Sequence, residues 1–445
     1  MNETLLGYQT AHFDVAEPAL IKRQLLQWST GFDCCCYLDN NTYSFYPYHS
    51  GECLLAVGID RQIIRWPADC QPGQDAFDAL KKLSVECGDW IFGGFSYDLK
   101  NDIEQLSSAN FDGLGFPDYH FFVPRYVFEL KLGKLYIHSK SEDPEIIFSQ
   151  ICQQKLSIQN AVPSGLALSP RMTKQQYLEA VSAIREDIIE GVIYEMNFCQ
   201  EFYAQNCAID PLPLFQSLNE MAKAPFSAYY KLGEQYLLCA SPERFLKKEG
   251  RKLISQPIKG TIKRGASNAE DQVLRQQLSE SQKDQAENVM IVDLVRNDLA
   301  RSCFPGSVKV EELFGIYSFE QVHQMISTVV GELRPEVHFV DAIRNAFPMG
   351  SMTGAPKVMS MKLIEQYEST RRAWYSGAVG YIRPNGDFDF NVVIRSLLYN
   401  AARSYLSLQL GGAIVFDSVP ELEYEECLLK AKAMQQLGIR LDSCS

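Results

Sequence analysis

The stretch Gln256-Pro257-Ile258-Lys259-Gly260-Thr261-Ile262-Lys263-Arg264-Gly265 follows a short apolar run, Arg251 to Ile254, that is typical of a β-strand. Pro257 and Gly260 favour a bend on each side of Lys259 and limit how far its backbone can move. A lysine held on a turn among apolar neighbours loses hydration, which favours its neutral form. A neutral amine is a nucleophile or a base, whereas a solvated turn lysine is only a positive charge. The decapeptide alone leaves both interpretations open.

The composition indicates a globular protein with an acidic balance. The chain has 445 residues, of which 46% are hydrophobic and 22% charged, enough for a sizeable core and two or three domains. A net charge of −13 argues against nucleic acid and anionic membrane surfaces as partners. No apolar run approaches the roughly 18 to 20 residues that span a bilayer, and Met1 to Leu20 lacks a signal-peptide pattern. Thirteen scattered cysteines without a CxxC pair favour reduced thiols, so we expect a cytoplasmic protein.

The order of expected elements indicates two segments of an α+β protein. Short β-like runs fill the first part of the chain, and a loop-like piece from Gln159 to Ser169 indicates a connector. We therefore expect an N-terminal region over residues 1–165 and a catalytic domain over residues 166–445. Grouped strands with helices outside them predict mostly antiparallel sheets. Thr173 and Gln176 predict a capping box, and a long polar helix is expected from about Asn268 to Leu299.

Two expected helices carry acids on one face. Asp284 and Glu287 lie three residues apart in the first, and Glu423, Glu426 and Lys430 share a face of a helix that starts after Pro420. Paired acids on two helices could share a hard divalent cation, and magnesium suits such oxygen ligands. Acids and lysines at helical spacing can equally form a solvated face. Both interpretations stay open.

Small residues near an expected helix and strand are candidates for ligand binding. In the stretch from Phe347 to Lys357, glycines and hydroxyls precede Pro356, which leaves free backbone N–H groups at a helix N-terminus. Such a terminus binds carboxylate or phosphate, although it is also typical of an ordinary capped helix. Gly411-Gly412-Ala413 follows another expected strand and allows a ligand to approach the backbone closely.

Three side chains are candidates for polar chemistry. Arg395, on an expected strand from Asn391 to Leu398, is a candidate fork for a carboxylate. Glu243 is a candidate acid, although Arg244 beside it could simply pair with it at the surface. His323 lies among apolar residues, where a structural role is the simpler interpretation unless other observations link it to a site.

In this order the motifs resemble the chorismate-binding enzymes, which include the large subunits of anthranilate synthase and aminodeoxychorismate synthase and the isochorismate and salicylate synthases. The motifs are SPERF (241–245), PIKGT (257–261), ENVMIVDLVRNDLAR (287–301), GSMTGAPK (350–357), YSGAVGYI (375–382), VVIRS (392–396) and DSVPELEYEE (417–426). The resemblance covers residues 170–436 strongly and 1–160 more loosely. It implies an α+β fold like that of anthranilate synthase component I, with two mostly antiparallel β-sheets packed together and helices outside.

Residue 259 separates two branches of this family. The anthranilate synthase pattern reads PIAGT, whereas PIKGT resembles the aminodeoxychorismate synthase large subunits. The resemblance implies that the Lys259 amine adds to C2 of chorismate as the C4 hydroxyl leaves, protonated by Glu243. Ammonia would then add at C4 and expel the lysine, giving 4-amino-4-deoxychorismate for 4-aminobenzoate and folate. An anthranilate synthase large subunit and a non-catalytic chorismate-fold regulatory subunit are the alternatives.

The resemblance also implies a binding role for further residues. Glu287 and Glu426 would hold Mg²⁺ on the substrate carboxylate, with Asp284 and Glu423 as outer or alternate acids. The implied substrate-binding residues are Thr261, His323, Ser351, Tyr375, Arg395, Gly411, Gly412, Ala413 and Lys430. The candidate tryptophan-binding residues are Asp39, Pro225, Phe226 and Ser227. No glutaminase module fits in the chain, so a separate glutamine amidotransferase subunit is the expected partner that supplies ammonia.

Three positions depart from the family pattern. Glu195 stands in Tyr194-Glu195-Met196 where the family often has glutamine, and it could alter substrate activation or pair with a lysine. Ala413 replaces a glycine that is frequent in the last glycine-rich turn. Leu38-Asp39-Asn40 matches the tryptophan-binding pattern only loosely.

Overall fold

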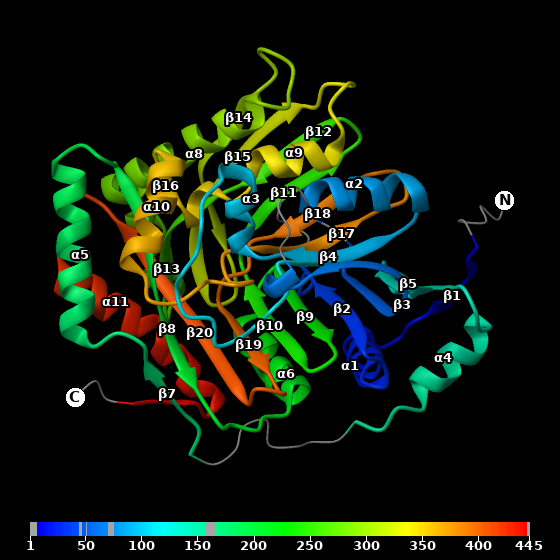
Figure 1. Ribbon diagram of the computed structural model, residues 1–445. Helices are drawn as coiled ribbons and strands as arrows, with labels where there is room; N and C mark the ends of the chain where they lie inside the picture. Colours follow the sequence, from blue (N-terminus) through cyan, green and yellow to red (C-terminus); the bar gives the residue numbers. More distant parts are fainter. Residues whose placement is uncertain (1–6, 44–46, 50, 70–74, 157–164, 443–445) are drawn as a thin grey trace.

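The computed structural model describes residues 7–43, 47–49, 51–69, 75–156 and 165–442, which form the α+β protein that the sequence predicts (Figure 1). Its strands are β1 (Gln9–Asp14), β2 (Cys34–Asp39), β3 (Cys53–Arg65), β4 (Ile91–Phe95), β5 (Tyr119–Lys131), β6 (Lys134–Ser139), β7 (Ala167–Pro170), β8 (Glu195–Ala204), β9 (Phe226–Leu232), β10 (Gln235–Ser241), β11 (Arg244–Glu249), β12 (Lys252–Gln256), β13 (Ile258–Lys263), β14 (Lys309–Ser318), β15 (Val322–Glu332), β16 (Gly354–Ala355), β17 (Ala378–Ile382), β18 (Phe388–Asn391), β19 (Ser396–Asn400), β20 (Tyr405–Ile414) and β21 (Arg440–Leu441). Its helices are α1 (Pro18–Ser29), α2 (Ala76–Cys87), α3 (Lys100–Glu104), α4 (Pro144–Cys152), α5 (Lys174–Ile189), α6 (Pro211–Ala222), α7 (Asn268–Glu280), α8 (Gln282–Ala300), α9 (Phe339–Ala346), α10 (Lys357–Tyr367) and α11 (Pro420–Lys432).

The strands form one hydrogen-bonded network with two arms that diverge from the long strand β5. One arm runs β3, β2, β9, β10, β19, β20 and β8. The other runs β4, β17, β18, β11, β12, β15 and β14. All of these pairs are antiparallel, as the sequence predicts. The expected pair of sheets is therefore two arms of one network.

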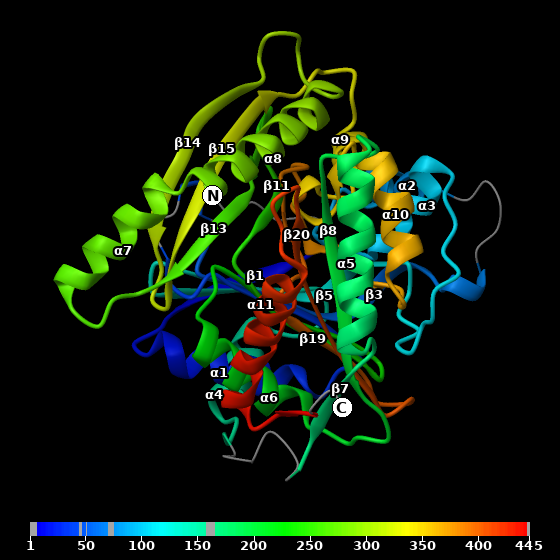
Figure 2. The ribbon, with the colours of Figure 1, turned by 90° about the vertical axis from the view of Figure 1, so that its left-hand side faces the viewer.

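The main core lies between the two arms. Large buried side chains from both, such as Leu54 and Tyr230 of one arm and Phe92 and Phe390 of the other, belong to one hydrophobic cluster. Burying apolar area on two facing sheets is what holds such layers together. A second cluster joins the outer face of the first arm to helices that include α1, α4, α5, α6 and α11, and Figure 2 shows α5 and α11 beside β8 and β20.

The predicted division at residue 165 stays a prediction. Most of the expected connector, Gln159 to Ser169, lies outside the described residues, which omit 157–164. Strands from both sides of the boundary pair directly, β2 with β9 and β4 with β17. The two segments therefore share both arms of the network.

Local signals explain several element ends. The Thr173 capping box is confirmed, because its hydroxyl accepts from the Gln176 amide at 3.2 Å and the Gln176 side chain accepts from the Thr173 amide at 2.9 Å. The expected single helix from Asn268 to Leu299 is wrong. Ser281 has φ −66° and ψ 105°, which ends α7, and its hydroxyl then caps α8 by accepting from the Asp284 amide.

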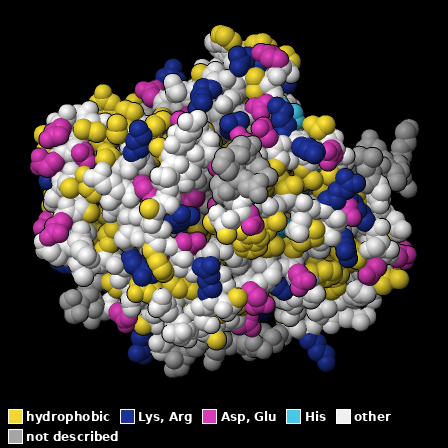
Figure 3. Space-filling view, in the orientation of Figure 1, with side chains coloured by type: hydrophobic (Ala, Val, Ile, Leu, Met, Phe, Trp, Pro, Cys, Tyr) yellow, Lys and Arg dark blue, Asp and Glu magenta, His cyan; other side chains and the backbone are white. Residues whose placement is uncertain are grey.

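On the face shown in Figure 3, Lys and Arg side chains are interspersed with Asp and Glu rather than gathered in a patch of one sign. Among the described residues, no helix combines the length and apolarity that a membrane span requires. The eleven cysteines in the described ranges are all free thiols.

A buried ion pair of the second arm provides a test of the fold. Arg244 of β11 is 1% exposed and donates from two nitrogens to the two carboxylate oxygens of Asp389 on β18, each at 2.9 Å. Substitution of Asp389→Ala leaves a buried guanidinium without this partner, so the free energy of unfolding should fall by about 3–5 kcal/mol in urea denaturation. The control is Asp293→Ala, which removes the exposed pair with Arg296 and should cost below about 1 kcal/mol. Equal losses for the two variants would contradict the prediction.

Candidate active site

A cavity of about 480 Å³ opens between the two arms beside α8 and α11. Its walls come from β8 and β20 of one arm, from β13 and β15 of the other, and from the two helices. The predicted site residues that line it are Glu243, Lys259, Thr261, Asp284, Glu287, Ser351, Tyr375, Arg395, Gly411, Gly412, Ala413, Glu423, Glu426 and Lys430. Residues far apart in the sequence are thus brought to one place, and His323 alone among those predicted for substrate or metal is not.

Lys259 reaches the cavity from a β-bulge in β13. Ile258 pairs with Ile326 of β15 and Thr261 pairs with Gln324, so β13 holds one residue more than its partner over this interval. Gly260 makes the bulge with φ +86°, and a Cβ there would lie 3.0 Å from side-chain carbons of Asp284 and Leu278. A bulge changes the direction of a side chain on its strand. The bend expected around Lys259 is therefore this bulge.

Lys259 is paired with a carboxylate that comes from β8. Its Nζ donates to Oε1 of Glu195 at 2.6 Å, and the two side chains are 11% and 1% exposed. Burial lowers the pKa of Lys259, but the carboxylates of Glu195, Glu287 and Glu243 together raise it above its ordinary value. Of the neutral and the charged form that the sequence leaves open, these carboxylates favour the charged one, an ammonium group.

Glu243 occupies the short loop between β10 and β11 and is 5% exposed. Burial raises the pKa of its carboxyl to about 7, while the nearby Ser351 hydroxyl, the Lys259 ammonium, the Ile258 amide and the Arg395 guanidinium oppose that rise. A carboxyl with a pKa near neutrality can hold a proton and release it at working pH. Glu243 is thus suited to the acid role that the sequence predicts.

The acids of α8 and α11 line the same cavity. Lys430 lies 2.8 Å from Glu426, and Lys283 lies 3.9 Å from Glu287, so each acid has a lysine four residues away on its own helix. Within the described part of the chain, no group of three or more His, Cys, Asp or Glu side chains is close enough to hold a metal ion. The oxygen donors nevertheless suit a hard cation by their chemistry.

A glycine makes room for the acids on α11. A Cβ at Gly412 would lie 3.6 Å from Oε2 of Glu423, 3.7 Å from Nζ of Lys430 and 3.9 Å from Oε1 of Glu426. A Cβ at Gly411 would lie only 2.1 Å from the Phe198 carbonyl of the neighbouring strand β8, so any side chain there would clash. The small residues of β20 therefore leave bare backbone as one wall of the cavity.

Arg395 does not lie on a strand, contrary to the expectation of a strand from Asn391 to Leu398. β18 ends at Asn391 and β19 begins at Ser396, and Arg395 occupies the turn between them with φ +51°. A left-handed conformation costs a non-glycine residue about 1–3 kcal/mol and concentrates at functional sites. The turn directs the guanidinium to the cavity, where the carboxylate-binding role expected of it is retained as a proposal.

His323 is directed away from the cavity, contrary to its expected place on the substrate side. Its ring is fully buried, with Nε2 3.0 Å from Asp271 and Nδ1 2.8 Å from the Ser318 hydroxyl. Successive side chains on a strand point to opposite faces, so the next residue of β15, Gln324, lines the cavity instead. The Oε1 atom of Gln324 is buried without a hydrogen-bond partner among the described residues. The structural interpretation of His323 from the sequence is therefore the better one.

Gln324 is one of several lining residues that the sequence analysis missed. The others include Asn197 of β8, Lys283 of α8 and Met352. The alternation along β15 is a signal that could have found Gln324, because it places either His323 or Gln324 in the cavity. No comparable local signal marks Asn197.

A buried arginine connects two segments of the chain that line the cavity. Arg372 is 1% exposed and forms two hydrogen bonds with the Glu368 carboxylate, at 2.6 and 2.9 Å. It also donates to the backbone oxygens of Asn197 at 2.8 Å and of Met352 at 2.6 Å. Because Asn197 and Met352 line the cavity, the arginine holds two of its walls at a fixed separation.

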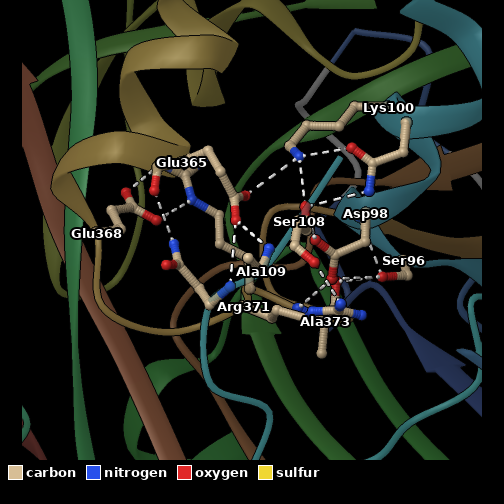
Figure 4. Close-up of polar contacts among 12 residues, drawn as sticks. Ser96, Asp98, Lys100, Ser108, Ala109, Glu365, Glu368, Arg371 and Ala373 are labelled. Atoms are coloured by element: carbon tan, nitrogen blue, oxygen red, sulfur yellow. Dashed lines mark hydrogen bonds and ion pairs between the residues drawn. The ribbon is translucent and has the colours of Figure 1, made fainter. Parts of the chain in front are cut away.

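A polar network from the N-terminal segment supports the residues around Arg372 from outside (Figure 4). Lys100 donates to the Ser108 hydroxyl at 2.8 Å and lies 3.6 Å from Glu365 of α10. Glu365 accepts from the Ala109 amide at 2.7 Å, and Arg371 donates to the Ser108 carbonyl at 2.5 Å. Residues 100–109 thus brace the segment that carries Arg372 and Tyr375.

The candidate tryptophan-binding residues lie together around a second, smaller cavity. Asp39, Pro225, Phe226 and Ser227 all line it, and its volume is about 50 Å³. The Asp39 carboxylate already accepts from Lys22 at 2.7 Å and from the Tyr37 hydroxyl at 2.8 Å. Tryptophan binding here stays a prediction.

The fold and the motifs are typical of chorismate-binding enzymes, and comparisons with known proteins agree. A profile of the chorismate binding enzyme family matches residues 34–436, so the chain belongs to this family. The chain is 35% identical to aminodeoxychorismate synthase component 1 of Bacillus subtilis over 359 residues, which cover 77% of this chain and 76% of that protein. It is 42% identical over 276 residues to a probable chloroplastic aminodeoxychorismate synthase of Oryza sativa subsp. japonica, covering 61% of this chain.

The match spans 30% of the Oryza protein, so the chain aligns with less than a third of the length of that relative. Among solved structures, anthranilate synthase component I of Streptococcus pneumoniae superposes with a TM-score of 0.74 at 25% identity. The superposition covers 86% of this chain and 91% of that one. The anthranilate synthase component I-like fold expected from the motifs is confirmed.

The glycine of the bulge provides a test of how Lys259 is placed. Gly260→Ala combines left-handed strain with a contact against α8, so the free energy of unfolding should fall by about 1–3 kcal/mol in urea denaturation. The control is Gly306→Ala, because Gly306 has a similar φ of +79° but no atom within 4 Å of the added Cβ. If both variants lose the same stability, the packing of the bulge on α8 is not what fixes it.

Proposed function

We propose that the chain is the chorismate-converting component of an aminodeoxychorismate synthase, which forms 4-amino-4-deoxychorismate from chorismate and ammonia. One observation carries the proposal: the Lys259 side chain enters a cavity in which a buried carboxyl, Glu243, has a pKa of about 7. A lysine that becomes a nucleophilic amine once it loses its proton, and an acid that can hold one, are the two groups that a substitution of a hydroxyl requires.

The proposed reaction proceeds in two substitutions. Once deprotonated, the Lys259 amine forms a bond to C2 of the ring, the two ring double bonds shift toward C4, and the C4–O bond breaks as Glu243 protonates the departing oxygen to give water. Ammonia then forms a bond to C4, the two double bonds shift back, and the C2–N bond breaks to release the lysine amine. The new ammonium group at C4 returns a proton to Glu243. The two substitutions together replace one direct exchange, which would be more difficult.

The remaining polar groups of the cavity are proposed to bind the substrate. Chorismate is a dianion with two carboxylates, and Arg395 and the Tyr375 hydroxyl are donors for one of them. Thr261, Ser351 and Lys430 supply further donors, and the bare backbone of Gly411, Gly412 and Ala413 allows the ring to approach closely. The wall residue Gln324 is added to this set in place of His323.

Glu287 and Glu426 are proposed to hold Mg²⁺, with Asp284 and Glu423 as outer acids. When bound, the ion supplies positive charge that attracts a substrate carboxylate into the cavity. The cation would compete with Lys430 and Lys283, which lie 2.8 and 3.9 Å from Glu426 and Glu287. Burial raises the pKa of Glu426, but Lys430 lowers it below its ordinary value, so this acid is ionised and suited to a cation.

The ammonia is proposed to come from a glutamine amidotransferase subunit. Relatives named component 1 support an assembly of two components. Anthranilate synthase is the second candidate, because the chain superposes on such an enzyme. Lysine at residue 259, where the anthranilate synthase pattern has alanine, favours the first.

The covalent step can be tested by trapping. Incubation with chorismate and Mg²⁺, without ammonia, should add the mass of chorismate less water to the intact protein, because Lys259 has bonded the ring and water has left. Lys259→Ala should show no adduct in the same mass spectrum, and Lys263→Ala, on the same strand, should behave as wild type. An adduct that persists in Lys259→Ala would remove the mechanism. Fluorescent anthranilate from wild type with ammonium would instead favour the second candidate.

The acid role of Glu243 predicts a pH dependence. The protonated carboxyl is the active form, so the rate of adduct formation should be constant below about pH 7 and fall as the pH rises through the pKa of about 7. The measurement is rapid quench with mass detection between about pH 5.5 and 9, on both sides of that pKa. Glu243→Gln should be about 100-fold slower and lose this limb of the profile. A wild-type profile that is flat through pH 7–8 would contradict the assignment.

A further inference from the structure

Glu195 is a buried carboxylate in contact with Lys259 that the reaction as proposed leaves without a role. It lies at the start of β8, is 1% exposed, and accepts the Lys259 ammonium at 2.6 Å through Oε1. Its second oxygen, Oε2, is buried and has no hydrogen-bond partner among the described residues. An unpartnered buried carboxylate oxygen is costly, so it calls for a reason.

The backbone holds this carboxylate in a fixed place. Ala355 of β16 pairs with Glu195 in an antiparallel bridge, and the Ser360 hydroxyl donates to the Glu195 carbonyl at 3.2 Å. A Cβ at Gly354 would lie 2.1 Å from that same carbonyl, so only glycine lets β16 approach so closely. The Glu195 side chain therefore extends from a rigid strand beside Lys259 rather than from a loop.

The proposed reaction requires that Lys259 lose a proton first. An ammonium nitrogen has no lone pair and cannot bond a ring carbon. Three carboxylates face Lys259: Glu195 from β8, Glu287 from α8 and Glu243 from the loop after β10, while Glu426 of α11 acts from farther away. Glu243 must carry its own proton to the leaving hydroxyl, and Glu287 is proposed to bind the cation. Glu195 is the group at hydrogen-bonding distance.

We propose that Glu195 is the general base that takes a proton from the Lys259 ammonium and returns it when the amine leaves the ring. The N–H proton moves to a Glu195 oxygen, and the freed electron pair of Nζ forms the bond to C2. When the C2–N bond later breaks, its electrons return to Nζ and the proton moves back from Glu195. Glu195 begins and ends the cycle ionised, as Lys259 begins and ends it charged. The inference rests on the proposed function.

A different role for Glu195 makes the opposite prediction. If Glu195 only anchors Lys259 as an ammonium, its carboxylate holds the lysine in the unreactive form. Its removal would then lower the pKa of Lys259, because burial of the amine remains while one opposing carboxylate is lost. More neutral amine would be present, and adduct formation would keep its rate or become faster. The base role instead predicts a slower reaction despite the lower pKa.

The experiment compares Glu195→Gln with wild type in two measurements. The first is competitive labelling of Lys259 by acetic anhydride against pH, read by mass spectrometry of the lysine peptide, which gives its pKa without any substrate. The second is the rate of the chorismate adduct in the presence of Mg²⁺. We expect a lower pKa for Lys259 in the variant, and adduct formation at least about 100-fold slower, the usual contribution of a general base. A variant rate equal to or above wild type would overturn the inference.

Two further variants separate a base from a merely structural residue. Glu195→Asp keeps the charge but retracts it by one methylene, so it should be about 10-fold slower than wild type and clearly faster than Glu195→Gln, within the span of general-base effects. An Asp variant at the wild-type rate, or no faster than the Gln variant, would overturn the inference. The same comparison with wild type decides the question if the Gln variant does not fold, as judged by cooperative thermal unfolding.

Glu201→Gln is the matched control. Glu201 is also on β8, is 2% exposed, and pairs with Arg171 at 3.0 Å outside the cavity. It should lose stability without changing the pKa of Lys259 or the adduct rate of the folded fraction. A loss like that of Glu195→Gln would show that any buried charge on β8 matters equally. If wild type forms no adduct at all, the proposed function has failed instead, and the labelling still reports whether Glu195 sets the pKa of Lys259.

Discussion

A positive charge buried in a protein must be balanced, and the burial of the Lys259 ammonium is the constraint on which this site depends. Burial lowers the pKa of the amine, yet carboxylates from β8, α8 and the loop after β10 together raise it above its ordinary value. These three elements belong to different parts of the chain, so the charge is balanced only when the two arms of the strand network face each other. The charge in the cavity is therefore stable only when the two arms of the network have come together.

The chain meets this requirement with strained or unusual backbone at a few points. Gly260 makes the bulge that directs Lys259, and Arg395 adopts φ +51° in the turn between β18 and β19. Such conformations persist only where the surroundings hold them. Arg372 supplies part of that support, because it ties the backbone of Asn197 to that of Met352 across the cavity wall.

Features set by neighbouring residues could be predicted from the sequence, and features set by distant ones could not. The Thr173 capping box is local, and it was predicted correctly. The break at Ser281 was missed because the polar spacing of α7 continues into α8 without a proline or glycine. The motifs identified most of the cavity residues, but the family resemblance assigned His323 to the substrate side, where the structure has Gln324 instead. Alternation along β15 offers two faces and does not say which one lines the cavity. The charge on Lys259 depends on Glu195, which lies 64 residues earlier in the chain. The residues next to Lys259 in the sequence do not indicate this pairing.

The pKa values of two glutamates in the same cavity are shifted in opposite directions. Burial acts on both, but Glu243 ends with a pKa of about 7, whereas Lys430 holds the pKa of Glu426 below its ordinary value. A carboxyl that keeps its proton is an acid, and one that has lost it is a ligand for a cation. Glu243 is 5% exposed, whereas the Glu426 side chain is 50% exposed and lies 2.8 Å from Lys430, four residues along α11. Depth and neighbouring charge together, rather than residue type, therefore assign the chemistry of each acid here.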